Sequence, residues 1–400
     1  MSGPLEGIKV VEMGLWVAGP AAAAILGDWG AQVIKIEPPE GDPFRGLFAS
    51  VMGSPMPVNP PFELDNRGKR SVCLNLETEE GREIAHTLIE QADVFVTNMR
   101  PRVLETFGLS YEDLSARYPR LIYCQVTGYG PDGDERNRAA YDVGAFWSRA
   151  GVAAALTAPG QEIPQQRGGM GDHMAGQSAA GAACAALLAR ERTGRGQRIS
   201  VSLLRIGVYM MGWDISLALR LKMPILTYDR VHAINPLITC YQSGDNRWFW
   251  LLLLQADRHW GDLCRALERE DLVADERFEN IEKRRVNGPA LVEELDRVFA
   301  TKTMAEWAEI LDQHNVWWAP VHSINEVTTD PLAQAAGAFV EVPGPDGPLP
   351  MVSTPADFSG TPWQAQGLPP ELGQHTEEVL LELGYDWEGM VALKERGVIP

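Results

Sequence analysis

Short apolar runs typical of buried strands alternate with helical segments along the first half of the chain, and this alternation restricts the fold more than any other feature. The expected strands are residues 8–13, 31–37, 93–97, 120–126 and 198–202, and the expected helices include 20–29, a segment from Thr78, and 173–192. Strands that alternate with helices form a parallel, doubly wound sheet. The sequence therefore predicts an α/β fold whose ligands bind beyond the carboxyl ends of the strands.

The segment from Pro131 to Gly171 interrupts this alternation. It is rich in Gly, Pro, Asp and Gln and has no regular hydrophobic period. A stretch of this length inside a compact chain is more often a functional loop than a linker. We expect it to cover an active site, and it ends at the dipeptide Gly171-Asp172.

The composition changes after about Met223. Residues 237–242 and 247–254 are expected to form a hairpin, and amphipathic helices are expected around 257–267, 288–300 and 304–313. A Pro- and Gly-rich tract over 331–370 then leads to two short terminal helices. We predict three parts: a large parallel-sheet domain over 1–222, a smaller α+β domain over 223–330, and a return segment over 331–400 that completes the large domain.

The charge of the chain argues against nucleic-acid binding. The chain has 35 Lys and Arg against 54 Asp and Glu, a formal net charge of −19, whereas phosphate neutralisation needs a basic face. We find no secretory leader and no apolar window of the roughly 18 residues that a membrane span needs. The five cysteines are far apart and sit in apolar stretches that suit buried free thiols. We therefore predict a cytoplasmic protein with neither nucleic-acid nor membrane partners.

The common cofactor and hydrolase motifs are missing from the sequence. There is no Gly-x-Gly-x-x-Gly after the first strand, no phosphate-binding Gly-x-x-x-x-Gly-Lys-Ser/Thr, no His-Glu-x-x-His and no Gly-x-Ser-x-Gly. The seven histidines are scattered, and only His173 adjoins a motif. We assign no metal and no permanently bound cofactor.

Asp172, at the head of the Ala-rich helix, has two readings. Its carboxylate could be an N-cap that accepts the free amides of the first turn. Alternatively, a carboxylate at a helix N-terminus stays ionised at neutral pH and can attack an acyl carbonyl, with backbone amides stabilising the oxyanion. Spacing alone does not separate a cap from a nucleophile.

Several ordered motifs resemble those of the family III CoA-transferases. In order they are Leu5–Glu12, Val17–Pro20, Gly30–Glu37, Asn66–Ser71, Gly171-Asp172 and Thr193–Gln197, continued by 319–321, 373–376 and 383–385. The resemblance covers essentially the whole chain. It implies a ring-shaped subunit with a large Rossmann-like domain and a smaller domain, two such rings being interlocked in a homodimer.

The resemblance also implies that Asp172 is the catalytic nucleophile of a CoA-transferase. The carboxylate would attack an acyl-CoA donor to give a mixed anhydride and CoA thiolate. The thiolate would then form an aspartyl-CoA thioester and release the donor acid, and an acceptor carboxylic acid would reverse these steps. Acyl-CoA and carboxylic acids are thus the expected small-molecule partners, and CoA is a substrate rather than a cofactor.

Positions that match the family are expected to line the CoA path, with Arg100 as the phosphate partner. They are Val17, Ala18, Leu74, Asn75, Leu76, Glu77, Asn98, Met99, Arg100, Ala139, Ala140, Tyr141 and Asp142. Asn75 and Asn98 could instead be turn residues at strand ends. Trp147, Trp213, Trp248 and Trp250 could line an acyl pocket or belong to the core.

Two departures from the family bear on specificity. Asn98-Met99-Arg100-Pro101-Arg102 replaces a common Asn-Phe-Arg-Pro-Gly, and the glycine run of the formyl-CoA transferases has no counterpart between Met223 and Trp250, which argues against formyl or oxalyl substrates. An α-methylacyl-CoA racemase is the main alternative, but Tyr141 stands where racemases have histidine, and a phenol is a poor base at neutral pH. A catalytically inactive CoA-binding protein is a third possibility. The donor and the acceptor acid are not identified by the sequence.

Overall fold

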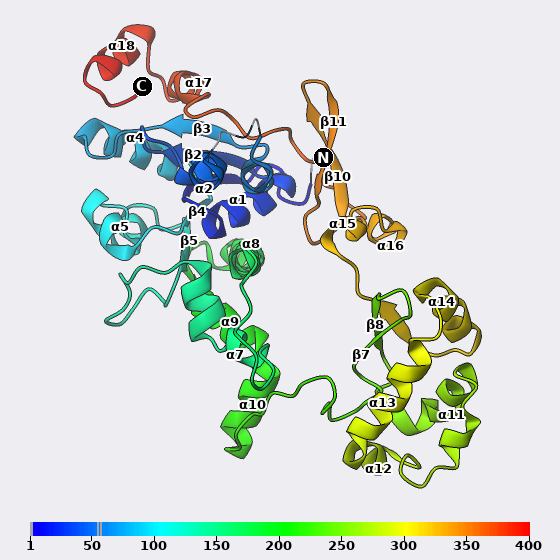
Figure 1. Cartoon of the computed structure of the whole chain (residues 1–400). Coiled ribbons are helices and arrows are strands. Elements are labelled where there is room, and N and C mark those ends of the chain that lie inside the picture. Colours follow the sequence, from blue (N-terminus) through cyan, green and yellow to red (C-terminus); the bar gives the residue numbers. More distant parts are fainter. Residues whose placement is uncertain (1–2, 54–55, 57) are drawn as a thin grey trace. The chain divides into compact units, whose positions relative to one another are not determined.

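The computed structural model describes residues 3–53, 56 and 58–400. The chain divides into two compact units. The large unit comprises Met1–Ala154, Gln165–Lys222 and Ala335–Pro400, and the small unit comprises Ala155–Pro164 and Met223–Gln334. Figure 1 shows both units with most of their helices and strands labelled.

A six-stranded parallel sheet forms the centre of the large unit, as the alternating sequence predicts. Its strands are β1 (Lys9–Met13), β2 (Gln32–Glu37), β3 (Arg70–Cys73), β4 (Val94–Thr97), β5 (Ile122–Thr127) and β6 (Arg198–Ser202). They are arranged in the order β3-β2-β1-β4-β5-β6, with Val10 of β1 between Val33 and Val94. The order reverses between β1 and β4, which is where ligands of doubly wound sheets bind.

Helices cover both faces of this sheet because successive strand residues point in opposite directions (Figure 1). Val94 and Val96 pack against α1 (Ala18–Asp28) and α8 (Met170–Thr193), whereas Phe95 packs in the core of the opposite face. That second core includes α4 (Glu79–Glu90), α5 (Pro101–Phe107), α6 (Tyr111–Arg117), α17 (Thr376–Glu382) and α18 (Trp387–Glu395). Thr78 caps α4 by accepting from the Gly81 N–H.

Small residues bring α1 and α8 close together. A Cβ added to Gly176 would lie 2.8 Å from the Ala21 Cβ and 3.1 Å from the Ala22 nitrogen. The Ala- and Gly-rich composition of α8 therefore reflects its packing against α1, which begins directly after the loop from β1. This packing places the first turn of α8 beside the carboxyl end of β1.

Two segments that the sequence suggests are irregular contain regular structure. The stretch 131–171 includes a wide π-type helix, η2 (Val143–Arg149), and α7 (Val152–Ala155). The tract 331–370 contains α16 (Pro331–Ala335) and the hairpin β10 (Phe339–Gly344) with β11 (Gly347–Val352). Prolines fit this hairpin because a two-stranded ribbon leaves the outer edge of each strand unpaired, and Pro343 faces Pro348 across it.

The other short helices of the large unit connect the strands or follow β6. They are η1 (Pro43–Gly46), α2 (Leu47–Met52), α3 (Pro60–Asn66), α9 (Leu203–Met210) and α10 (Gly212–Leu221). No helix within the described ranges is long and apolar enough to cross a bilayer.

The small unit is built on a three-stranded antiparallel sheet. The predicted hairpin is confirmed as β7 (Cys240–Gln242) and β8 (Trp248–Leu251), and β9 (Trp318–Pro320) pairs with β8. The helices are α11 (Ala256–Ala266), η3 (Glu270–Val273), α12 (Ile281–Val286), α13 (Gly288–Phe299), α14 (Met304–Gln313) and α15 (Ile324–Val327). Trp307, Tyr241 and Phe249 are fully buried in its core.

The four tryptophans considered for an acyl pocket, and the five cysteines, differ in their exposure to solvent. Trp147 belongs to the core of the large unit, whereas Trp213, Trp248 and Trp250 are exposed, and none of the four lines the cavity that contains Asp172. All five cysteines are free thiols; Cys73, Cys124 and Cys264 are buried and Cys184 and Cys240 are half-buried.

Candidate active site

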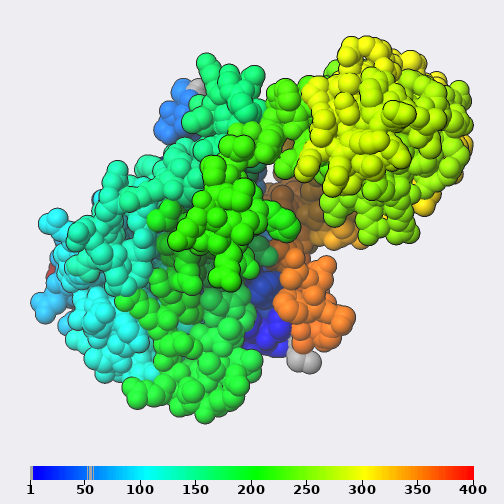
Figure 2. All heavy atoms as spheres, turned by 90° about the horizontal axis from the view of Figure 1, so that it is seen from below, coloured from blue at the N-terminus to red at the C-terminus, as the bar shows by residue number. Residues whose placement is uncertain are grey.

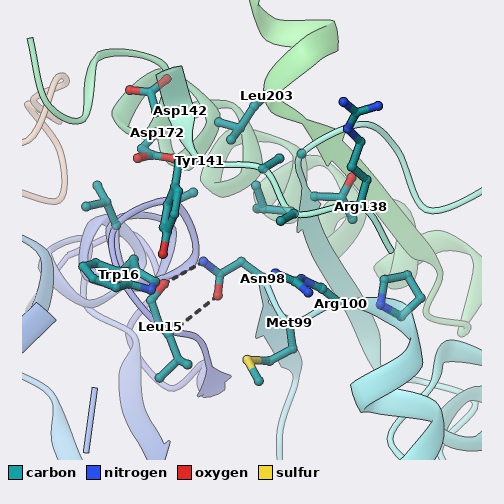
Figure 3. Close-up of a pocket in the computed structure, with 18 of the residues that line it drawn as sticks. Leu15, Trp16, Asn98, Met99, Arg100, Arg138, Tyr141, Asp142, Asp172 and Leu203 are labelled. Atoms are coloured by element: carbon teal, nitrogen blue, oxygen red, sulfur yellow. Dashed lines mark hydrogen bonds between the residues drawn. The ribbon is translucent and has the colours of Figure 1, made fainter. Parts of the chain in front are cut away.

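A cavity of about 350 Å³ opens at the point where the strand order reverses. Its walls come from the loops after β1 and β4, the segment 136–142 and the first turn of α8 (Figure 3). The lining residues are Leu15, Trp16, Val17, Ala18, Asn98, Met99, Arg100, Pro101, Val103, Val126, Thr127, Gly128, Arg136, Arg138, Ala139, Ala140, Tyr141, Asp142, Asp172 and Leu203. The site thus lies where the fold predicts a ligand.

Asn98 joins the two strand-end loops. Its Oδ1 accepts the Leu15 N–H at 3.0 Å, and its Nδ2 donates to the Leu15 carbonyl at 2.7 Å, as the dashed lines in Figure 3 mark. Gly14 and Gly19 leave room for this amide, since a Cβ at either position would lie within 3.2 Å of its Oδ1. Asn98 is therefore a structural clamp as well as a lining residue.

Trp16 has a backbone conformation that bulky residues rarely adopt. Its φ is 65°, in the left-handed region, and its N–H donates to Asp42 Oδ1 at 3.0 Å. The indole ring packs edge-on against Tyr141, with 5.7 Å between ring centroids, and also against Phe44. Strained backbone conformations of this kind are concentrated at ligand-binding sites, where the surrounding structure holds them in place.

Buried charges lie beneath these loops. Glu12 is fully buried and accepts from Lys35 Nζ at 2.8 Å and from Lys69 Nζ at 2.6 Å. Lys35 Nζ also contacts the Asp42 carboxylate at 3.1 Å. Asp42, which accepts the Trp16 N–H, is therefore itself bound by a buried ammonium group. Burial lowers the pKa of the Lys69 ammonium to about 8.

Asp172 lies within the first turn of α8 and is not its N-cap. The helix begins at Met170, and its N-cap position is Gly169, which has a left-handed φ of 77°. Gly171 donates its N–H to Asp142 Oδ2 at 3.0 Å. The predicted start at His173 is therefore three residues late, because the glycines 168, 169 and 171 resemble a loop in the sequence.

The electrostatics of Asp172 differ from the expectation of an ionised carboxylate at neutral pH. Burial raises its pKa to about 7, the neighbouring Asp142 carboxylate adds to the rise, and His173 opposes it. Burial also raises the pKa of Asp142. Two carboxyl groups thus lie at one end of the cavity, and desolvation is the main cause of the raised pKa of each.

Most of the predicted site residues meet in this cavity. Val17, Ala18, Asn98, Met99, Arg100, Ala139, Ala140, Tyr141, Asp142 and Asp172 all line it. Leu74, Asn75, Leu76 and Glu77 line a neighbouring cavity of about 400 Å³, which shares Leu15 and Met99 with the first. Asn75 accepts the Glu77 N–H at 3.1 Å, so it forms a turn there as well.

Sequence reasoning missed three prominent lining residues, Trp16, Arg136 and Arg138. Figure 3 shows Arg138 and Arg100 at the end of the cavity away from Asp142 and Asp172. Arg136 pairs with Glu105 at 3.0 Å and Arg138 with Glu135 at 2.6 Å. The sequence feature that could have identified the two arginines is their position shortly before Ala139, within a loop that is expected to cover the active site.

Comparison with known proteins identifies the family. Residues 5–376 match CoA-transferase family III. The chain is 36% identical to the (R)-2-hydroxy-4-methylpentanoate CoA-transferase of Clostridioides difficile, over 99% of each chain. It is 34% identical to the cinnamoyl-CoA:phenyllactate CoA-transferase of Clostridium sporogenes, over 95% of this chain and 93% of that protein.

A solved structure of a CAIB/BAIF family protein from Brucella suis has the same fold. It superposes with a TM-score of 0.85 at 30% identity, over 96% of this chain and all of that one. Sequence and structure therefore agree along almost the entire length. This chain belongs to CoA-transferase family III.

Proposed function

We propose that the protein transfers CoA from an acyl-CoA donor to a carboxylic acid, with Asp172 as the nucleophile. The observation that carries this proposal is the position of Asp172, on the wall of a cavity that has arginines at its other end. Such a cavity suits a thioester with a polyanionic tail. The arginine end fits phosphate groups, and the carboxylate end fits the acyl carbonyl.

The chemistry follows from an ionised Asp172 carboxylate. Its oxygen attacks the thioester carbonyl, the C–S bond breaks, and CoA leaves as a thiolate that accepts no proton while water is excluded. The thiolate then attacks the aspartyl carbonyl of the anhydride, the donor acid departs as a carboxylate, and CoA remains bound to Asp172 as a thioester. An acceptor carboxylate attacks this thioester and takes the CoA through the same two steps in reverse, which regenerates Asp172.

The proposed path of CoA runs along the two connected cavities. Arg100 is exposed and has no side-chain partner in the part of the chain that the structure describes, so its guanidinium is available for a phosphate. The segments Val17-Ala18, Leu74–Glu77, Asn98–Arg100 and Ala139–Asp142 lie along this path. We place the phosphates near Arg100 and Arg138 and the thiol near Asp142.

We further propose 2-hydroxy acids with branched or aromatic side chains as the transferred acids. Two relatives carry such acids in their names, 2-hydroxy-4-methylpentanoate and phenyllactate. The cavity wall beside Asp172 offers matching apolar surface from Trp16, Tyr141 and Leu203. Aromatic rings favour edge-on contacts of the kind already present between Trp16 and Tyr141.

The assembly that we propose is an interlocked homodimer of ring-shaped subunits in the cytoplasm. In support, α10 has no buried residue, its Trp213 and Leu219 are 82% and 75% exposed, and Tyr209 near the end of α9 is 84% exposed. Figure 2 shows this green segment on the face of the large unit that is turned toward the viewer. So much apolar surface favours a protein partner. We retain 1–222, 223–330 and 331–400 as the proposed domain division.

The test is a transfer assay with a panel of acyl-CoA donors and carboxylic acids, read by mass spectrometry of new thioesters. Asp172→Asn should abolish transfer, and hydroxylamine should convert the activated Asp172 of the wild-type protein to a hydroxamate, with release of the acid or CoA. Full activity in Asp172→Asn would refute the mechanism. In deuterium oxide without an acceptor, α-deuteration of a 2-methylacyl-CoA at the rate of transfer would instead favour the racemase.

A further inference from the structure

His173 follows the candidate nucleophile directly, yet it does not line the same cavity. It faces a second, largely apolar cavity of about 320 Å³ between α1, α3, α8 and residues 352–355. Its Nε2 lies 3.1 Å from Asp65 Oδ1 on α3. Asp65 is 2% exposed, and its second oxygen has no hydrogen-bond partner among the residues described. The imidazole is thus anchored to a buried carboxyl group.

The groups around this pair are mostly acidic. Asp65, Asp172 and Asp142 all act on His173 and favour its charged form. Arg67 and Asp28, which line the second cavity, hydrogen-bond to each other at 3.0 Å. Lys69 donates to the Asp65 backbone carbonyl and to Glu12, both at 2.6 Å. Asp65 thus contacts the imidazole directly, and the charges of Asp172 and Asp142 act on it as well.

We propose that His173 is a positioning residue for Asp172: held as an imidazolium by Asp65, it supplies the positive charge that keeps the adjacent carboxylate ionised near neutral pH. This inference rests on the proposed role of Asp172 as the nucleophile. The chemical need is clear, because only the carboxylate attacks a thioester, and Asp142 beside it opposes ionisation.

The pKa directions agree with this geometry. Burial alone would lower the pKa of His173, but the hydrogen bond and charge of Asp65 raise it above its ordinary value. Burial raises the pKa of Asp65, and His173 counteracts that rise through the same contact. The side chain of His173 is 43% exposed, so solvent screens the interaction and a moderate effect on Asp172 is expected.

The first experiment titrates the His173 imidazole by NMR in the full-length protein, which requires no turnover. In wild type its pKa should exceed the ordinary value of about 6.5. Asp65→Asn should lower it, and Asp172→Asn should lower it as well, since coupling between two titrating groups is reciprocal. A His173 pKa that neither substitution changes would overturn the proposal, whether or not the protein proves to be a transferase.

The second experiment measures the pH dependence of kcat/KM. The acid limb of this profile should reflect the ionisation of Asp172. In His173→Gln the limb should move to higher pH by about one unit, because the positive charge is lost, and activity at pH values below the limb should fall about tenfold. His173→Lys keeps a cation and should leave the limb closer to its wild-type position. A purely structural role would lower activity at every pH without moving the limb, and that result in a folded His173→Gln would refute the proposal.

The matched control is His232→Gln. His232 also pairs with an aspartate, Asp229, at 2.7 Å, but this pair is exposed and belongs to the small unit. Its loss should leave the acid limb unchanged. If Asp172→Asn retained transfer while the imidazole still responded to that substitution, the proposed function would fail and the His173–Asp172 coupling would stand.

Discussion

The backbone N–H of Gly171 donates to the carboxylate of Asp142 across 3.0 Å, and no larger residue fits at that position. A Cβ on Gly171 would lie 2.3 Å from Asp142 Oδ1 and 2.3 Å from Phe146 Cγ. The residue before the candidate nucleophile is thus pressed against the second carboxyl group of the site. Close packing therefore requires glycine at position 171, next to the candidate nucleophile.

Gly171→Ala should therefore damage the site. Because Asp142 and Phe146 are buried, they can yield only by moving the first turn of α8, and we expect a stability loss of about 1–3 kcal/mol. A displaced Asp172 should reduce kcat/KM about a hundredfold. Urea unfolding and steady-state kinetics measure the two effects.

Gly181→Ala, in the same helix, is the control. A Cβ there meets nothing within 4 Å, and the substitution should stabilise α8 by about 0.5–1 kcal/mol without affecting kinetics. If both alanine variants behaved alike, close packing at Gly171 would not be the cause.

Glu12→Gln should strongly destabilise the protein. The substitution leaves Lys35 and Lys69 buried without the carboxylate that contacts both, and breaking a buried ion pair costs about 3–5 kcal/mol. Glu377→Gln removes an exposed contact with Lys394 at 2.8 Å and should cost less than about 1 kcal/mol. Equal losses in chemical denaturation would show that the buried cluster tolerates uncompensated charge.

Much of the fold was predictable because its signals are local. β6 over 198–202 and α14 over 304–313 match their expected bounds. α13 and β4 differ from the expected 288–300 and 93–97 by one residue at an end, and α11 is shifted by one residue from the expected 257–267. β3 and β9 were not predicted, since β3 begins with the polar residues Arg70 and Ser71 and β9 ends at Pro320, so neither presents an apolar run. The strands β10 and β11 were missed because their prolines normally signal irregular structure.

The site was less predictable from the sequence than the fold. The order of motifs in the sequence points to Asp172 and to the lining segments. It does not show how deeply Asp172 is buried or which charged groups lie beside it. The raised pKa of Asp172 depends on burial and on Asp142, 30 residues earlier in the chain. The contact of His173 with Asp65 joins residues 108 apart, and the left-handed Trp16 is set by a buried aspartate from another loop. Only the folded chain brings these groups together.

Asp172→Asn should stabilise the protein in a pH-dependent way. The pKa of Asp172 is about 7 when folded and near 3.8 when unfolded, so the unfolded chain loses this proton first as the pH rises. Wild type therefore loses stability between about pH 4 and pH 7 relative to the neutral amide. At pH 8 the variant should be more stable by roughly 4 kcal/mol, because the two pKa values differ by about three units and each unit corresponds to about 1.4 kcal/mol, and near pH 4 the difference should be small. A difference that does not change with pH would contradict a raised pKa.

Trp16→Ala should change which acyl groups the enzyme accepts more than how fast it turns over small ones. The indole and Tyr141 form the apolar wall beside Asp172, and losing a large apolar contact costs about 1.5–3 kcal/mol, or roughly 10- to 100-fold in kcat/KM. This loss should fall on branched and aromatic 2-hydroxyacyl-CoA donors, because the acetyl group has no apolar side chain to bury against the indole. Trp16→Phe should keep most of the selectivity, and Trp387→Ala, an exposed residue of α18, should keep all of it. If kcat/KM for acetyl-CoA fell as far as that for the aromatic donors, the indole would act through the packing of its loop against Phe44 and Tyr141, and not through selection of the acyl group.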